Sequence, residues 1–373
     1  MIYKILKITG ICVAAVIALL LVAIAAFLIW RALGKAANER AMVINTPNGI
    51  DVLEKVSIGG IDQFIQIRGR DLKNPLLLCV HGGPGSTFLP YAYKFQTAWE
   101  KHFTVVQWEQ RGAGLTYRLH GDDIADTMSL ERMILDGIEV VVYLTKRYGK
   151  DRIILLGHSF GSILGTNMIK RRPDLFHAYI GVGQMVDKHE GWRIGHEYVL
   201  AHARAAGDTE ALQKLDEIGP PPYGSTFAEF DAKVGIQQGL VSAYNGAIYG
   251  VTSEATFGKM VILAPRLPLG YILALMGGSR MSQKALFVDV EIKLDMKKLG
   301  KKFDVPIFFF LGRNDYVVPS TLAAGYFEEI EAPVKELVWF DRAAHAPFLT
   351  QPTAFLDALV EKVRPIAVKV ATD

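Results

Sequence analysis

Cysteine is scarce in this sequence, and long runs of basic residues, internal repeats and low-complexity tracts are absent from it. The two cysteines, Cys12 and Cys79, fall in separate apolar runs, which excludes a disulfide framework and leaves the redox compartment open. The 41 basic and 38 acidic residues are dispersed along the chain, so nucleic acid is not an expected partner. What is left is an ordinary globular composition, 50% hydrophobic and 21% charged, with a formal net charge of +3.

The histidines give no sign of a metal site. His189, His196 and His202 fall on one predicted helix, where the first two lie about 10 Å apart along the axis and the last two on different faces. The pair His196-Glu197 also lacks the second histidine, four residues after the first, that a zinc-binding helix needs. The sequence therefore predicts no metal.

One long apolar run stands near the N-terminus. Residues 8–30 contain no charged side chain, and about 20 apolar residues are enough for a helix to cross the hydrocarbon of a bilayer. The alternative is a cleaved signal peptide, but its apolar region is usually only about 7–15 residues long. We therefore predict a single-pass membrane anchor. Lys4 and Lys7 precede the run and Arg31 follows it, so the side of the membrane stays open.

Beyond the anchor, short apolar runs alternate with helix-like segments. The runs are rich in β-branched and aromatic residues, which is typical of strands covered on both faces of a sheet. Such strands are expected at residues 75–80, 104–108, 152–156, 178–182, 306–311 and 335–340, and a half-exposed strand at 62–68. Helices are predicted at residues 129–148, with Ser129 as N-cap, and at 160–172. This alternation predicts an α/β fold with a mostly parallel sheet and helices on both of its faces.

The alternation stops between residues 186 and 292. This region is helix-like, begins with an amphipathic stretch at 189–206 and is interrupted by prolines at 220–222. We interpret it as a helical cap inserted over the C-terminal edge of the sheet; the alternative is an independent second domain. The predicted organisation is an N-terminal tail (1–7), a transmembrane anchor (8–30), a stalk (31–45), the first part of an α/β core (46–185), the cap (186–292) and the second part of the core (293–373).

Residues 157–161, Gly-His-Ser-Phe-Gly, match the pattern G-x-S-x-G. The pattern is short enough to occur by chance, so its context decides its meaning. It lies between a predicted strand and a predicted helix, which is the strand–turn–helix arrangement of a nucleophile elbow. The N-terminus of that helix directs unpaired N–H groups at charge developing near the serine. We predict Ser159 as a nucleophile; the alternative is a Gly/Ser-rich turn without chemistry.

A serine hydroxyl needs a positioned base, and candidates follow two later strands. Asp315 comes directly after the strand at 306–311, and His345 comes after the strand at 335–340. The chain order of serine, acid and histidine is that of a catalytic triad on an α/β sheet. Asp187, after the strand at 178–182, is the alternative acid. His158 is adjacent to Ser159, so its side chain points elsewhere and it is not expected to be the base.

Two backbone donors are needed for an oxyanion hole. The N–H of Phe160, at the start of the helix after the nucleophile, is expected to supply one. The other is expected from the loop after the strand at 75–80, where glycines permit a close backbone approach and a proline stiffens the turn. Gly83 is the candidate donor. The loop consists of His81, Gly82, Gly83, Pro84 and Gly85, all predicted to support the site.

Together these motifs resemble the prolyl aminopeptidase (proline iminopeptidase)-like branch of the α/β-hydrolases. The resemblance rests on Asp315, on His345 and on the sequences HGGPG at 81–85, EQRGAG at 109–114 and GHSFGS at 157–162. It implies an eight-stranded sheet, a helical cap, no cofactor, and hydrolysis of esters or amides through an acyl-enzyme. It also implies the triad Ser159, Asp315 and His345, with Gly83 and Phe160 at the oxyanion hole. Arg111 and His158 are then expected to support the site without reacting.

The sequence departs from the family pattern at Glu109, where aspartate is usual, and at Phe160, where tryptophan is usual. Asn245 stands where a cap acid would hold a substrate's free amine, although Glu190 or Glu197 could replace that acid. The predicted function is therefore a membrane-anchored serine hydrolase acting on a small-molecule or short-peptide acyl substrate. The alternatives are a prolyl aminopeptidase and a catalytically silent binding module, and the oligomeric state is open.

Overall fold

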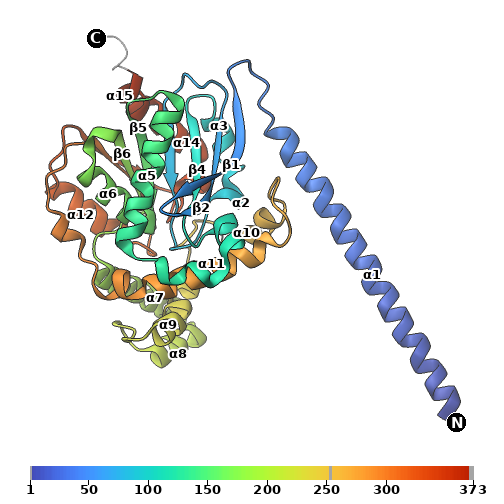
Figure 1. Ribbon diagram of the computed structural model, residues 1–373. Coiled ribbons are helices and arrows are strands. Elements are labelled where there is room, and N and C mark those ends of the chain that lie inside the picture. The colour runs from blue at the N-terminus through green and yellow to red at the C-terminus, as the bar shows by residue number, and fades with distance from the viewer. Residues whose placement is uncertain (1, 252–253, 369–373) are drawn as a thin grey trace.

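Eight strands of the described chain form a single sheet. A computed structural model describes residues 2–251 and 254–368 (Figure 1). The strands are β1 (Ile50–Ile58), β2 (Ile61–Gly69), β3 (Leu76–Val80), β4 (Thr104–Glu109), β5 (Ile153–His158), β6 (Phe176–Val182), β7 (Ile307–Gly312) and β8 (Lys335–Phe340). Their order is β1-β2-β4-β3-β5-β6-β7-β8, antiparallel from β1 to β4 and parallel from there to β8. The predicted mostly parallel, eight-stranded α/β fold is confirmed.

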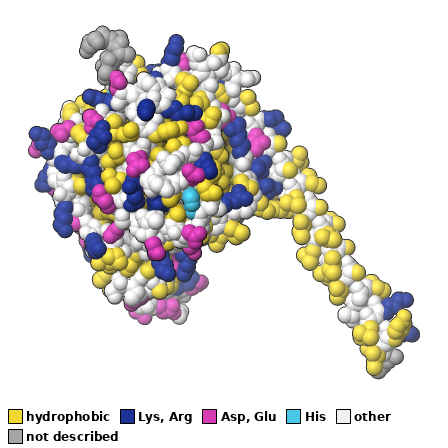
Figure 2. Space-filling view, in the orientation of Figure 1, with side chains coloured by type: hydrophobic (Ala, Val, Ile, Leu, Met, Phe, Trp, Pro, Cys, Tyr) yellow, Lys and Arg dark blue, Asp and Glu magenta, His cyan; other side chains and the backbone are white. Residues whose placement is uncertain are grey.

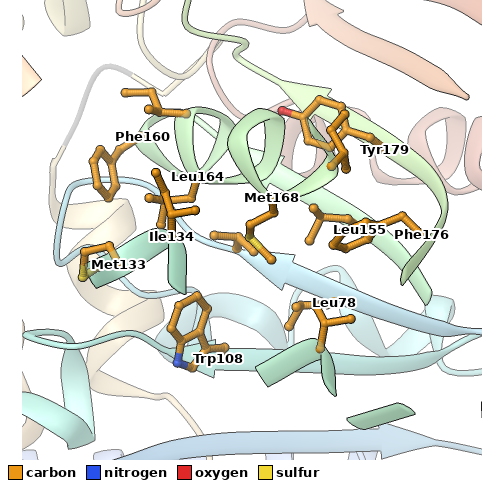
Figure 3. Packing of buried hydrophobic residues seen from close by; sticks show 14 of the residues in the cluster. Leu78, Trp108, Met133, Ile134, Leu155, Phe160, Leu164, Met168, Phe176 and Tyr179 are labelled. Carbon is orange, nitrogen blue, oxygen red and sulfur yellow. The ribbon is translucent and has the colours of Figure 1, made fainter. Parts of the chain in front are cut away.

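The central strands are buried because helices cover both faces of the sheet. One face packs against α5 (Leu130–Tyr148) and α6 (Phe160–Arg171), and the other against α3 (Gln96–Trp99) and α14 (Pro352–Ala358). Figure 3 shows side chains of α5 and α6, among them Met133 and Met168, lying over Leu78 and Trp108 of the sheet. Because β3 through β7 are covered on both sides, their ends form a rigid edge on which loops are placed.

The start and end of α5 follow from its sequence. Ser129 caps the helix, because its Oγ accepts a hydrogen bond from the N–H of Arg132 at 3.1 Å. Gly149 ends it in a left-handed conformation with φ 60°, which glycine adopts at little cost. Further helices of the body are α2 (Leu89–Ala92), α4 (Gly114–His120), α12 (Ser320–Glu329), α13 (Pro347–Thr350) and α15 (Arg364–Val368).

Between β6 and β7 the chain forms a group of helices at one end of the sheet (Figure 1). These cap helices are α7 (Lys188–Ala206), α8 (Thr209–Ile218), α9 (Phe227–Ala243), α10 (Glu254–Ile262) and α11 (Tyr271–Phe287). α7, α8 and α9 share a small apolar cluster of their own that includes Val199, Leu215 and Val241. Since α7 begins a few residues after β6, the cap lies over the C-terminal ends of the parallel strands.

The N-terminal segment is one straight helix, α1 (Ile2–Ala41), which projects away from the body (Figure 1). In the described chain it is the one helix that is long and apolar enough to cross a membrane, with a mean hydropathy of 3.2 over its best 18 residues. The helix includes most of the predicted tail (1–7) and residues 31–41 of the predicted stalk. It continues because that stretch is rich in good helix formers such as alanine, lysine and glutamate and contains no proline.

One strand was not predicted. β1 (Ile50–Ile58) pairs along its whole length with β2 but is an edge strand, with half-buried and exposed residues in alternation. Its sequence, IDVLEKVSI, carries charges between its apolar residues and has no long apolar run, so it gave a weaker signal than the central strands.

Candidate active site

Ser159 occupies the sharp turn between β5 and α6. Its backbone has φ 56° and ψ −125°, a region that residues with a Cβ rarely adopt, and its N–H donates to the carbonyl of Val182 at 2.9 Å. The flanking glycines make the turn possible. A Cβ at Gly157 would lie 2.7 Å from the carbonyl oxygen of Gly161, and a Cβ at Gly161 would collide with the carbonyl of Val80. Packing at the C-terminal ends of β3, β5 and β6 therefore holds the strained backbone of Ser159 in place.

An acid and a histidine meet at the ends of β7 and β8. His345 Nδ1 lies 2.8 Å from Asp315 Oδ2. The other carboxylate oxygen, Oδ1, accepts hydrogen bonds from the N–H groups of Val317 at 3.0 Å and Val318 at 2.9 Å. A carboxylate held in this way fixes the proton on Nδ1 and leaves the lone pair of His345 on Nε2. The arrangement suits a general base.

Ser159 and His345 lie on the wall of the same cavity, which has a volume of about 410 Å³. In the described part of the chain no hydrogen bond joins their side chains, and such bonds often tighten only when substrate is bound. Two glycines allow the close packing around them. A Cβ at Gly82 would lie 2.8 Å from Ser159 Cβ, and one at Gly183 would lie 2.7 Å from His345 Cε1. The structure thus brings the three predicted residues Ser159, Asp315 and His345 to one place.

Of the two predicted oxyanion donors, Gly83 lines the cavity and Phe160 directly follows Ser159. Phe160 is the first residue of α6, so its N–H has no partner within the helix. Gly83 lines the cavity and has φ 111°, which favours glycine. Pro84 and Gly85 turn away from the cavity. A Cβ at Gly85 would lie 2.7 Å from the Cα of Ser279 in α11, so this loop and the cap are in close contact.

Two further predicted residues, His81 and His158, are buried and neutral. His81 Nδ1 donates to the carbonyl of Gly82 at 2.9 Å while its Nε2 accepts from the N–H of Gln110, and burial lowers the pKa of His81 to about 4. His158 Nε2 donates to the carbonyl of His345 at 2.8 Å, and burial lowers the pKa of His158 well below its ordinary value. Both therefore hold backbone in position.

Comparison with known proteins agrees with this geometry. The model of the alpha/beta hydrolase family matches residues 77–358. The chain belongs to this family. It is 29% identical to the probable aminopeptidase YbaC of Bacillus subtilis (strain 168) over 338 residues, which cover 86% of this chain and 99% of that protein.

Solved structures show the same fold at low sequence identity. A proline iminopeptidase from Mycobacterium smegmatis has a TM-score of 0.62 and 17% identity, covering 86% of this chain and 100% of that one. A membrane phospholipase A described as a bacterial virulence factor has a TM-score of 0.54 and 14% identity, covering 100% of both chains. The predicted α/β-hydrolase is confirmed, its fold is similar to that of a proline iminopeptidase, and the protein is a hydrolase of the alpha/beta hydrolase family.

Arg111 does not reach the cavity of this hydrolase. Its guanidinium donates to Asp136 at 2.9 Å, to Thr127 at 2.8 Å and to the carbonyl of Gly59 at 2.7 Å. It therefore joins the β1–β2 turn to α5 and to the segment before it. The resemblance placed Arg111 among the residues that support the site; the structure puts its contacts in the body, on the face of the sheet covered by α5.

A buried carboxylate, Glu109, connects the body to the cap and was not predicted to do so. Thr87 Oγ1 and the hydroxyl of Tyr271 each donate to its Oε1 at 2.5 Å, and the N–H of Leu115 donates to Oε2. Burial raises the pKa of Glu109, although these hydrogen bonds favour its charged form. Because Thr87 follows the oxyanion loop and Tyr271 begins α11, Glu109 fixes the loop and the cap together. The only signal in the sequence was the departure from the family's usual aspartate.

The other acids considered from the sequence are engaged elsewhere. Asp187, the alternative triad acid, lines the cavity, but its side chain caps α7 through the N–H of Glu190 at 3.0 Å and pairs with Lys297 at 3.4 Å. Glu190 and Glu197 both pair with Arg193 on an exposed helix face. Asn245 accepts from the N–H of Gly250.

The cavity wall combines apolar side chains with amides and one residue of each charge. Its apolar members include Met185, Val186, Trp192, Val317, Val318, Pro319 and Leu322, its amides are Gln184, Gln238 and Gln283, and its charged residues are Asp187 and Lys188. Gln238 Nε2 is buried and has no hydrogen-bond partner among the described residues. The described residues contain no group of three or more histidine, cysteine or acidic side chains that could hold a metal ion.

Proposed function

We propose that this protein is a membrane-anchored serine hydrolase that cleaves an ester or amide bond of a small acyl substrate. The observation that carries the proposal is the Asp315–His345 hydrogen bond of 2.8 Å on the wall that also holds the strained Ser159. An unstrained surface serine would need neither the elbow nor a carboxylate-oriented histidine.

In the proposed reaction His345 Nε2 takes the proton of the Ser159 hydroxyl as Oγ attacks the acyl carbonyl. The N–H groups of Phe160 and Gly83 donate to the oxyanion that forms, and Asp315 stabilises the imidazolium. His345 then gives its proton to the leaving alcohol or amine, and the C–O or C–N bond breaks to leave the acyl-enzyme. A water molecule, deprotonated by His345, releases the acid and regenerates Ser159.

Esters of apolar acids fit the cavity better than peptides with a free N-terminal amine. An ammonium group inside an apolar cavity needs an unpaired carboxylate, and in the described chain the acid on the cavity wall, Asp187, is already engaged by a helix N-terminus and by Lys297. The apolar side chains and amides of the wall suit an uncharged acyl group.

A prolyl aminopeptidase is the second candidate. The full-length relative named as a probable aminopeptidase favours it, since that similarity covers 99% of the relative. The two candidates differ in one measurement. Proline and alanine arylamides should be inert if the esterase proposal is right, while short-chain p-nitrophenyl esters should be hydrolysed; turnover of the proline arylamide would favour the aminopeptidase.

The serine mechanism is tested by labelling with a fluorophosphonate probe. The wild-type chain should be labelled at Ser159, and Ser159→Ala should not be labelled. Ser86 also lines the cavity, so Ser86→Ala is the matched control and should keep its label. Folded wild-type protein that takes up no label would instead support the silent binding module.

A further inference from the structure

The cap carries an apolar strip that faces solvent. Leu269, Leu273 and Met276 have exposed fractions of 43%, 74% and 69%, and their spacing places them on one side of α11 and the turn before it. The opposite side of α11 is buried, with Tyr271 and Gly278 against the body. We call Leu269, Leu273 and Met276 the cap ridge. Three large apolar side chains together on a surface need a partner.

The cap ridge begins next to the end of the predicted membrane anchor. Arg31 Nη2 and Lys35 Nζ of α1 donate to the carbonyl of Leu267 at 3.1 and 2.8 Å, and Asn38 Nδ2 donates to the carbonyl of Leu263 at 2.9 Å. The side chain of Leu263 packs against Gly34. Figure 1 shows α10 on the side of the body beside α1, and Figure 2 shows apolar side chains along α1 and at the edge of the body next to it. The segment before α11 is therefore fixed to α1.

The position of that contact along α1 sets the depth of Leu267 relative to the bilayer. The uncharged run ends at Trp30, and Lys35 lies five residues further on, which is about 8 Å of helix. The polar layer on each side of a bilayer is about 5–8 Å thick, from a total of about 40–45 Å around a core of about 30 Å. If residues 8–30 span the hydrocarbon, Leu267 lies within this layer. Arg31 and Lys35 then stand at the depth of the lipid phosphates.

We propose that the cap ridge inserts into the surface of the same bilayer that α1 crosses, as a second membrane contact. This inference rests on the membrane anchoring in the proposed function. A lipid surface is the occupant that fits, because the ridge is apolar, ends at the exposed Arg280, which pairs with Asp231 at 3.4 Å, and is held at the depth of the headgroups by α1. Two contacts fix the orientation of the body, whereas a single helix would leave it free to rotate.

The side of α11 opposite the cap ridge contacts residues around the candidate active site. Ser282 Oγ donates to the carbonyl of Gly112 at 3.0 Å, Tyr271 bonds Glu109, and Gln283 lines the cavity. α11 therefore lies between the proposed bilayer surface and the cavity. The substrate class that follows is an amphiphilic acyl ester dissolved in the bilayer, rather than a small ester from bulk water.

The contact is tested with the full-length chain in phosphatidylcholine nanodiscs. The native Cys79 is buried, so a background of Cys12→Ser accepts a single environment-sensitive fluorophore at Leu273→Cys or Met276→Cys. Val142→Cys, on an exposed apolar residue of α5, is the matched control. The probe at either ridge position should shift to the blue and be quenched by lipids that carry a nitroxide, while the probe at Val142→Cys should be quenched only by soluble iodide.

The quenching of the probes distinguishes a lipid contact from exposure to water and from a protein contact. Ridge probes quenched by iodide as strongly as the control overturn the proposal. A blue shift without quenching by nitroxide lipids means that a protein, such as a second copy of this chain, covers the ridge, and it also overturns the proposal. The wild-type chain labelled at Cys12 reports on α1 itself: without lipid quenching there, the anchor fails and the ridge contact fails with it.

A second measurement tests the substrate class. Leu273→Glu with Met276→Glu should lower hydrolysis of a long-chain ester in vesicles about tenfold or more, because charges oppose insertion. Hydrolysis of soluble p-nitrophenyl acetate should change less than about twofold, since the ridge lies outside the cavity. Equal losses on both substrates, or no loss on either, contradict the inference. A wild-type chain inactive on every ester refutes the proposed function alone, because the fluorophore measurement does not need activity.

Discussion

The edge of the sheet and the cap are built in different ways. At the edge, backbone groups hold the reacting residues: Asp315 accepts from two N–H groups, and Ser159 is fixed by the carbonyl of Val182. The strands beneath are buried on both faces. The cap joins the body mainly through the inner side of α11, where Met281 and Leu286 belong to the main core, whereas α7, α8 and α9 pack in a smaller cluster. Most cap residues are half-buried or exposed.

We infer from this difference that the edge carries the proposed chemistry and that the cap carries selectivity. Catalytic geometry tolerates displacements of only about 0.5 Å, which requires the dense packing found under the sheet edge. Side chains of α7, α8 and α9, which pack in the smaller cluster, can change without disturbing that geometry. If this division is right, substitutions at the edge should abolish the reaction, and substitutions in the cap should change which substrate is used.

The largest effect is expected from the acid. Asp315→Asn should lower kcat about 10³–10⁴-fold, because an amide cannot hold the proton on His345 Nδ1. Asp187→Asn, at the entrance to the cap, should lower it less than about tenfold, since Asp187 is a helix cap there. Both are measured as initial rates on the same ester. The reverse order would make Asp187 the acid and would place chemistry in the cap.

Two buried histidines of the body should make the fold sensitive to acid. The folded-state pKa of His81 is lowered to about 4, and that of buried His158 is also lowered. As the pH falls from about 6.5 towards about 4, the unfolded chain binds protons at these residues that the folded chain does not, so stability is lost on acidification.

The free energy of unfolding should therefore fall by up to about 2.7 kcal/mol per pH unit in this range, about 1.4 kcal/mol for each histidine. Denaturant titrations at pH 7, 6 and 5 measure the slope. His81→Gln should reduce it by one histidine's share. A slope that is the same in the variant and in the wild-type protein would contradict this account.

In the cap, Trp192→Ala should change substrate preference. Trp192 lines the cavity from α7, and losing its ring should lower kcat/KM for long acyl chains about tenfold while the acetyl ester changes less than about twofold. Phe230 packs edge-to-face on Trp192 at 5.8 Å without lining the main cavity, so Phe230→Ala is the matched control. If acetyl and long-chain esters lose activity together, the cap positions catalytic groups after all.

The smallest expected effect measures the backbone strain at Ser159. Ser159→Gly and Ser159→Ala both remove the hydroxyl, but only glycine adopts φ 56° and ψ −125° without steric cost. Ser159→Gly should therefore be more stable than Ser159→Ala by about 1 kcal/mol, the lower end of the strain found at such positions. Thermal or denaturant unfolding of the two inactive variants measures the difference. Equal stability would mean that the elbow stores no strain.

Much of the site could be predicted because its signals are local. The turn at Ser159 is specified by neighbouring glycines, and the cap of α5 by Ser129 and Gly149. The order of Ser159, Asp315 and His345 along the chain was enough to propose their roles, since parallel strands bring their C-terminal ends to one edge. Each of these features depends on a few consecutive residues and on the period of the hydrophobic pattern.

Other features of the molecule were decided only by the tertiary structure, because they depend on residues far apart in the sequence. Glu109 and Tyr271 are joined across 162 residues, and Arg31 and Leu267 across 236. No local pattern specifies such pairs, because they form only when helices and strands have packed. The same is true of the engagement of Asp187 by Lys297, and of the exposed face of α11, whose apolar residues look like core in the sequence. The sequence was enough to predict a candidate triad at one edge of the sheet, and packing determined what lies around it.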